Sequence, residues 1–427
     1  MGAGRIQQKT TPAPAPAPAP APKPAATTTT AQTGFDTADQ FQPAVSAPVA
    51  LTTPAPVNKL TAAMTPAQSQ AFAQLSTADQ QTLKDFTQTW AQPLWRAGGR
   101  AFFDEGDGMG PIRDAILSGQ GATIANLARG AIASDQKSGG QRAQQDLVNV
   151  LGRNGGAMLT KADPATGKTL LQELSALNGG GATALGYDRS QLAANIITDL
   201  SWTGMSQAAG AQDCGALAIA ASLNRNPAAY AGMMIDLANG DQVTLPSGQS
   251  GQLQAAPFDP QSNKSMTNQL IDAAMSIPMQ SDMSAGVTGE QVKAALQSVY
   301  GGSWAAMYTP DATEERSAAP RQEAQKMAAT IMDEQLKKGQ PLFANYDGHW
   351  VRVTYLGPLN GPDIQVEAMA QNGKGAMQVP IQQFLDGLDG LVFQSNLTMP
   401  PEWMQNAAWA DPGGGSPHGT QGSDDMR

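Results

Sequence analysis

The chain has 427 residues, of which 45 are Gly, 30 are Pro and 15% are charged, and its formal net charge is −10. This length predicts two or three folded units, and the acidic balance excludes the broad basic surface that nucleic acids or anionic membranes require. No run of about 18 apolar residues occurs, so we expect no membrane-spanning helix.

The N-terminal segment is rich in Pro, Ala and Thr. Residues 11–24 alternate Pro mainly with Ala, which is typical of an extended polyproline II arm. We therefore expect residues 1–58 to be a disordered arm that serves as a spacer or a secretion leader.

Residues 59–200 carry the signals of a helical region. Thr65 and Gln68 have the spacing of a capping box, and Leu83, Phe86 and Trp90 lie on one face of a following helix. Further helices are expected at 112–116, 124–132, 145–151, 168–177 and 188–200. This region contains neither Cys nor His, so we expect it to be regulatory and to control access to a site elsewhere.

From residue 201 the pattern changes. Helices are expected at 213–223 and 228–238, followed by short alternating strands at 351–356, 364–370, 376–379 and 391–393. Helices followed by an antiparallel sheet predict an α+β unit over 201–410. The Gly-rich residues 411–427 are expected to be a disordered tail.

The chain contains one Cys and two His, which limits its chemistry. A single Cys excludes an internal disulfide framework, and so few Cys and His ligands argue against a zinc site, so we expect no metal and no cofactor. Cys214 begins an apolar helix, where free amides and the helix dipole favour the thiolate, and Gly215 would leave room for substrate. A lone Cys can also be a small buried apolar residue.

His349 is the candidate base for Cys214, because His418 lies in the Gly-rich tail. His349 begins a predicted strand, and its separation from Cys214 falls within the roughly 130–150 residues typical of papain-type enzymes. The pair is therefore interpreted as a nucleophile and a general base.

Strand register suggests a third member. Aligning the apolar faces of the strands at 351–356 and 364–370 can set Val353 opposite Ala368, and this register sets His349 opposite Asn372. Asn372 would then orient the imidazole. Gln371 and Glu367 are the other candidates for that role.

An oxyanion would be stabilised by the backbone N–H of Cys214 and by one side-chain donor. Gln207 and Gln212 both precede Cys214 and are the candidates for this donor.

These segments resemble the papain-like cysteine peptidase clan, and in particular the bacterial double-glycine leader peptidases. The resemblance rests on a Gln before Asp213-Cys214-Gly215 at a helix start, on His349 before an aromatic residue and alternating Val, and on a Gly-rich turn with a following helix at 372–385. It implies a papain-like fold, in which a helix bearing the Cys packs on an antiparallel sheet bearing the His. It does not extend to residues 1–200.

The sequence thus predicts a papain-like thiol hydrolase that acts on a peptide or protein substrate through a Cys thioester. Peptide cleavage, glutamine deamidation and acyl transfer share this intermediate. The alternatives are a cell-wall amidase of the NlpC type and a non-catalytic papain-like module that binds or regulates a partner. No Sec-type signal is visible, so we expect the protein to be cytoplasmic, or exported by a dedicated machine.

Overall fold

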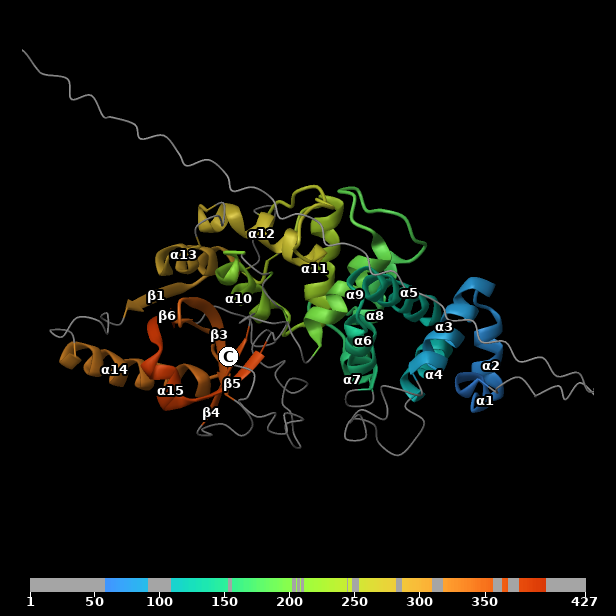
Figure 1. Ribbon diagram of the computed structural model, residues 1–427, viewed down its shortest axis with the longest axis horizontal. Helices are drawn as coiled ribbons and strands as arrows, with labels where there is room; N and C mark the ends of the chain where they lie inside the picture. The colour runs from blue at the N-terminus through green and yellow to red at the C-terminus, as the bar shows by residue number, and fades with distance from the viewer. Residues whose placement is uncertain are drawn as a thin grey trace, which may run out of the picture. The chain divides into compact units, whose positions relative to one another are not determined.

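The computed structural model describes residues 58–90, 109–152, 156–201, 205, 208, 211–243, 245–247, 253–281, 286–308, 318–355, 363–367 and 376–396. The expected N-terminal arm, except for Asn58, and the expected C-terminal tail lie outside these ranges. The described residues combine helices with an antiparallel sheet, and the helices dominate the N-terminal part (Figure 1).

The helices of the N-terminal part follow one another closely along the chain. They are α1 Lys59–Ala62, α2 Pro66–Ala73, α3 Thr77–Trp90, α4 Gly110–Leu117, α5 Gly121–Ser138, α6 Arg142–Gly152, α7 Ala157–Thr160, α8 Leu170–Leu174, the 3-10 turn η3 Ser175–Leu177, and α9 Arg189–Leu200. The predicted capping box forms at α2, where the Gln68 N–H donates to Thr65 Oγ1 and the Thr65 N–H donates to Gln68 Oε1. Local sequence therefore determines where α2 begins.

The later helices are interleaved with the sheet. They are α10 Cys214–Leu223, α11 Pro227–Asn239, α12 Met266–Met279, α13 Gly289–Tyr300, α14 Ala318–Lys337 and α15 Ile381–Asp386. Helices α12, α13 and α14 were not predicted from the sequence. Helix α14 lies between β1 and β2 along the chain, so the predicted order of helices first and sheet afterwards holds only in part.

Six strands of the described chain form one antiparallel sheet in the order β1-β6-β2-β3-β4-β5. Their bounds are β1 Ser303–Tyr308, β2 Leu342–Tyr346, β3 His349–Tyr355, β4 Asp363–Glu367, β5 Ala376–Pro380 and β6 Leu388–Asn396. The four predicted strands correspond to β3, β4, β5 and β6, whereas β1 and β2 were not predicted.

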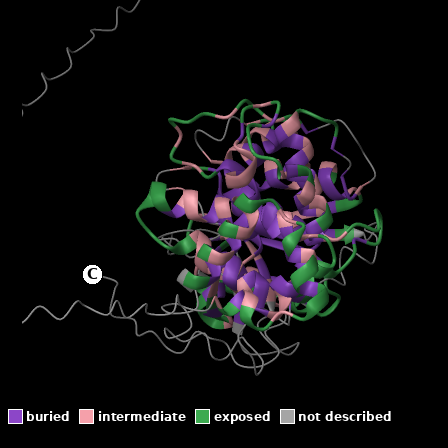
Figure 2. Cartoon of the chain, turned by 90° about the vertical axis from the view of Figure 1, so that its right-hand side faces the viewer, coloured by how far each residue is buried: buried purple, intermediate pink, exposed green. Residues whose placement is uncertain are grey.

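The two faces of the sheet belong to different apolar clusters. Trp350 of β3 joins a larger cluster that also contains α10 residues, and its neighbours Val351 and Val353 join a smaller cluster with α14 and α15 residues. Alternate residues of a strand point to opposite faces, so β3 separates these two clusters. The larger cluster also contains residues of α9 such as Ile196, so one core extends from the N-terminal helices to the sheet. Figure 2 shows that buried residues gather in the interior and exposed residues lie on the outside.

The register between β3 and β4 differs from the prediction. Val353 pairs with Val366 and Tyr355 pairs with Ile364, whereas the predicted register set Val353 opposite Ala368. The prediction was therefore wrong by two residues. Both registers align the same apolar faces, so the pattern could not separate them, and the observed one needs a connection that is two residues shorter.

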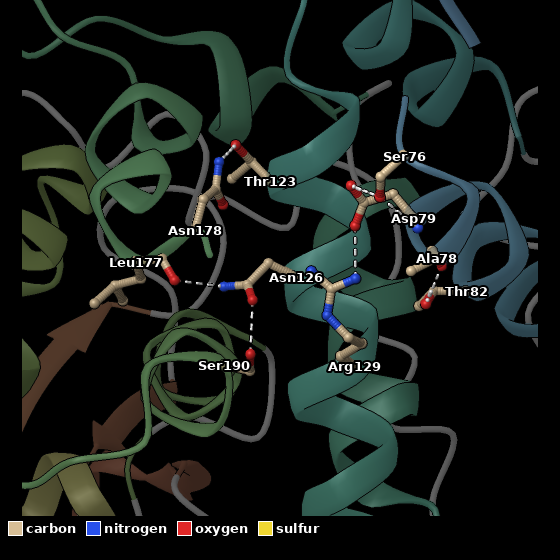
Figure 3. A network of polar contacts seen from close by, with 10 residues as sticks. All are labelled: Ser76, Ala78, Asp79, Thr82, Thr123, Asn126, Arg129, Leu177, Asn178 and Ser190. Atoms are coloured by element: carbon tan, nitrogen blue, oxygen red, sulfur yellow. Dashed lines mark hydrogen bonds and ion pairs between the residues drawn. The ribbon is translucent and has the colours of Figure 1, made fainter. Parts of the chain in front are cut away.

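Close packing between α5 and α9 depends on Gly130. A Cβ atom on Gly130 would lie 1.8 Å from the carbonyl oxygen of Ser190, so α9 could not approach α5 as it does. The buried side-chain amide of Asn126 on α5 is bonded on both sides. Ser190 Oγ of α9 donates to its Oδ1 at 2.6 Å, and its Nδ2 donates to the Leu177 carbonyl at 3.1 Å (Figure 3). A glycine contact and a satisfied polar group thus fix the position of α9.

Candidate active site at the start of helix α10

Cys214 is the first residue of α10, as the sequence predicted. Its side chain is 7% exposed, and every residue of this helix is buried. Helix α10 packs against β3, and Figure 1 shows it beside the sheet with α12 and α13 on its other side. The thiol therefore lies where the helix N-terminus meets the strand that begins with His349.

Three backbone amides face the Cys214 sulfur. They belong to Trp350, Gly215 and Cys214 itself, and each lowers the pKa of the thiol, but burial outweighs them and the neighbouring Asp213 carboxylate adds to it. The net result is that the pKa of Cys214 is raised. This is opposite to the lowered pKa that the helix start alone predicted, because the helix dipole was weighed there without desolvation.

Trp350 holds β3 against the segment before α13. Its indole Nε1 donates to the Val287 carbonyl at 2.8 Å. Val287 in turn lies so close to α10 that a Cβ atom on Gly215 would approach its Cγ2 to 2.4 Å. The room at Gly215 is therefore taken by Val287, and the expectation that it accommodates substrate was wrong.

A partly buried charge cluster lies beside the thiol, and its Asp213 is fully buried. Lys264 Nζ is 3.1 Å from Asp213 Oδ2 and also forms an ion pair with Asp272 on α12. Burial, followed by the charge of Asp213, raises the pKa of Asp272 to about 7. Burial opposes the Lys264 charge, but the two carboxylates outweigh it and raise the pKa of Lys264, which keeps the ammonium charged.

His349 is partly exposed and follows a tight turn. Asp347 and Gly348 both have positive φ angles, 49° and 74°, as a two-residue hairpin turn requires, and His349 pairs with Tyr346 across it. Tyr346 and Val351 belong to the smaller cluster, so strand alternation places His349 on that face of the sheet and Trp350 on the face toward Cys214.

The structure describes the remaining candidate residues in part. Gln212 is exposed, and its side-chain oxygen lies near Gly286. Gln207, Gln371 and Asn372 lie outside the described residues, and Glu367 ends β4 opposite Arg352. The register that set Asn372 opposite His349 is not the one formed, so that reason for choosing Asn372 is lost.

Sequence reasoning missed the Asp213, Lys264 and Asp272 cluster and the amide of Trp350. Asp213 was named only as part of the resemblance, although its place directly before Cys214 puts a charge beside the thiol. Lys264 and Asp272 could not, because they come to Asp213 from α12 and the loop before it, which only the tertiary fold brings together.

In comparisons with known proteins, no protein-family model and no curated protein sequence matched the chain. Among the described residues, none of the helices is both long enough and apolar enough to cross a membrane.

Proposed function

We propose that the chain is a papain-like thiol hydrolase in which Cys214 attacks a peptide or amide carbonyl and His349 is the general base. The observation that carries this proposal is the amide of Trp350 facing the Cys214 sulfur at the start of α10. His349 directly precedes Trp350, so the start of the strand that carries the imidazole lies near the start of the helix that carries the thiol.

The raised pKa of Cys214 determines how this reaction would run. A neutral thiol at rest must lose its proton as it attacks, so His349 acts as a general base during the step and not as one half of a stable ion pair. Strand alternation places His349 on the face of the sheet opposite to Cys214. For His349 to act as the base, its imidazole must therefore rotate past the start of β3 toward Cys214 when substrate binds.

The sulfur bonds to the carbonyl carbon, the leaving amine takes the proton from His349, and water then hydrolyses the thioester. The backbone N–H of Cys214 and a side-chain amide, Gln207 or Gln212, would stabilise the oxyanion. Asn372 stays the proposed orienting group, with Gln371 and Glu367 as the alternatives.

The proposal is tested with peptides that carry a thiol-reactive electrophile in place of the scissile amide. The full chain should form a covalent adduct on Cys214, detected by mass spectrometry after proteolysis. His349→Ala should slow adduct formation by about 100-fold or more, the usual contribution of a general base. His418→Ala is the matched control, because it removes the other His of the chain. Equal rates for His349→Ala and the unchanged chain would refute the role of His349.

A second candidate is a non-catalytic papain-like module that binds a partner. It is favoured by the 7% exposure of Cys214, by its raised pKa and by the occupation of the space at Gly215. In that case the electrophilic peptides would modify Cys214 only after denaturation. A peptide library read by mass spectrometry separates the activities within the first candidate, since cleavage, deamidation and acyl transfer give different products.

A further inference from the structure

Residues 286–288 lead directly into α13, and we call this segment the strap. Thr288 caps α13 through a capping box with Gln291, and Val287 is partly buried. Helix α13 packs against α10, the helix that begins with Cys214 (Figure 1). The strap therefore belongs to the surroundings of the candidate nucleophile.

The strap contacts residues that come before and after the thiol along the chain. A Cβ atom on Gly215 would lie 2.4 Å from Val287 Cγ2, so Val287 packs directly on the residue that follows Cys214. A Cβ atom on Gly286 would lie 3.7 Å from Gln212 Oε1, so Gly286 lies near the side chain two residues before the thiol. The strap therefore lies along the start of α10, where Cys214 is 7% exposed.

The local sequence of α13 directs Val287 to this position. Val287 directly precedes the capping residue Thr288, and Val292 is the fourth residue of the helix, which is the spacing of a hydrophobic staple. Both valines lie against α10, because the Cβ atom on Gly215 would also lie 3.3 Å from Val292 Cγ2. The staple explains why an apolar side chain of the strap fills the space at Gly215.

One hydrogen bond ties the strap to the sheet. Trp350 Nε1 donates to the Val287 carbonyl at 2.8 Å, and the backbone N–H of the same Trp350 faces the Cys214 sulfur. In the part of the chain that the structure describes, no other hydrogen bond engages the backbone of Gly286 or Val287. Trp350 therefore contacts both the thiol and the segment that packs beside it.

Beyond the staple and this hydrogen bond, the strap buries little surface. Gly286 and Val287 are partly buried, and Thr288 is exposed. A segment with little buried surface and few hydrogen bonds opens locally at a much lower free-energy cost than the whole fold. Loss of one hydrogen bond would shift such an opening equilibrium by about fivefold.

We propose that the strap controls access to Cys214, and that the hydrogen bond from the Trp350 indole to the Val287 carbonyl holds it closed. A substrate that brings its carbonyl to the sulfur must displace Val287 from Gly215, so the chain at rest is inactive until the strap opens. This inference rests on the proposed function, because it concerns the regulation of the same thiol. Access to the thiol is nevertheless measurable without any turnover.

Access is measured as the rate at which iodoacetamide labels the folded full chain at pH 8, where Cys214 is the single thiol. Trp350→Phe keeps an aromatic ring and the backbone N–H but removes the indole donor, so labelling should be about fivefold faster. Val287→Ala keeps the carbonyl and removes the methyl groups that cover Gly215, so labelling should be at least about threefold faster.

Trp304→Phe is the matched control, because Trp304 is also buried and its Nε1 donates to the Gly301 carbonyl at 2.9 Å. Trp304 lies on β1, which β6 and β2 separate from β3, so its labelling rate should equal that of the unchanged chain. Low concentrations of urea distinguish strap opening from global unfolding. Local opening exposes little surface, so the labelling rate should stay nearly constant below the unfolding transition.

Unchanged labelling in either Trp350→Phe or Val287→Ala would overturn the inference. An equal acceleration in Trp304→Phe, or a labelling rate that rises steeply from the lowest urea concentration, would overturn it as well. Failure of the proposed function gives a different result. Faster labelling of both variants, together with peptide adducts that form equally fast with and without His349, would support the strap and refute the hydrolase.

Discussion

The backbone N–H of Trp350 faces the sulfur of Cys214, which joins the first residue of α10 to the second residue of β3. This contact packs the start of the strand that carries His349 against the start of the helix that carries the thiol. It also encloses the sulfur, and burial then raises the pKa that the helix start would otherwise lower. One contact therefore both assembles the candidate site and keeps its thiol neutral at rest.

We expect the folded chain to react slowly with iodoacetamide at neutral pH. The raised pKa and 7% exposure of Cys214 both limit the thiolate available to the reagent. The rate at pH 7.5 should be at least about tenfold lower than in urea, and it should keep rising above the ordinary thiol pKa of about 8.5. Cys214 is the single Cys, so no other thiol contributes. Fast labelling of the folded chain at pH 6 would show a lowered pKa instead.

Gly215→Ala should destabilise the protein although alanine favours helices. The new Cβ would meet Val287 Cγ2 at 2.4 Å, and such overpacking costs about 1–3 kcal/mol, more than the gain of about 1 kcal/mol from replacing glycine in a helix. Gly232→Ala on α11 is the matched control, because its nearest contact would be an ordinary 3.5 Å from Glu173. In urea denaturation, the free energy of unfolding should fall for Gly215→Ala and should rise by up to about 1 kcal/mol for Gly232→Ala. A rise in the free energy of unfolding for both variants would mean that Val287 moves away from the new Cβ atom at little cost, and it would contradict the prediction.

Asp199 should make stability fall as pH rises. Its folded pKa of about 7 lies above the model value of 3.8, so between these values the folded state holds a proton that the unfolded state has lost. The free energy of unfolding therefore decreases across this window, by about 2 kcal/mol from this group between pH 5 and 7. Asp199→Asn keeps an acceptor for Tyr230 and removes the titration.

The measurement compares urea unfolding of Asp199→Asn and the unchanged chain at pH 5 and pH 8. The difference in the free energy of unfolding between the variant and the unchanged chain should shift in favour of the variant by about 2–3 kcal/mol from pH 5 to pH 8. Asp389→Asn, at an exposed position of β6, is the control and should show no such change. Parallel pH profiles for Asp199→Asn and the unchanged chain would contradict the raised pKa.

Local signals predicted many of the elements. The capping residues Thr65 and Asp188 begin α2 and α9, and the alternating segments after His349 became β3 to β6. Helix α13 carried a comparable signal, the capping box of Thr288 and Gln291, which the sequence analysis overlooked. These features are readable because residues a few positions apart determine them.

The candidate site was less predictable because its energetics depend on distant residues. The pKa of Cys214 depends on burial under β3, and the charge beside it depends on Lys264 and Asp272 reaching Asp213. None of these contacts leaves a pattern in a single sequence. Cys214 and His349 were proposed from their rarity and spacing alone, whereas the raised pKa of Cys214 depends on the fold.

The register between β3 and β4 could not be predicted from the sequence, because two registers align the same apolar faces. It can be tested directly by disulfide trapping in a Cys214→Ala background. Thr354 pairs with Gln365. Facing residues in antiparallel strands have Cα atoms roughly 4.5–5.5 Å apart, a distance that a disulfide can span. The double variant Thr354→Cys, Gln365→Cys should therefore form a disulfide. The sequence-predicted register would instead place Thr354 opposite Glu367. Thr354→Cys with Glu367→Cys is therefore the matched comparison. Mild oxidation should cross-link the first pair at least about tenfold faster, read by the mobility of the oxidised chain on a denaturing gel. Faster cross-linking of the second pair would restore the register that sets His349 opposite Asn372.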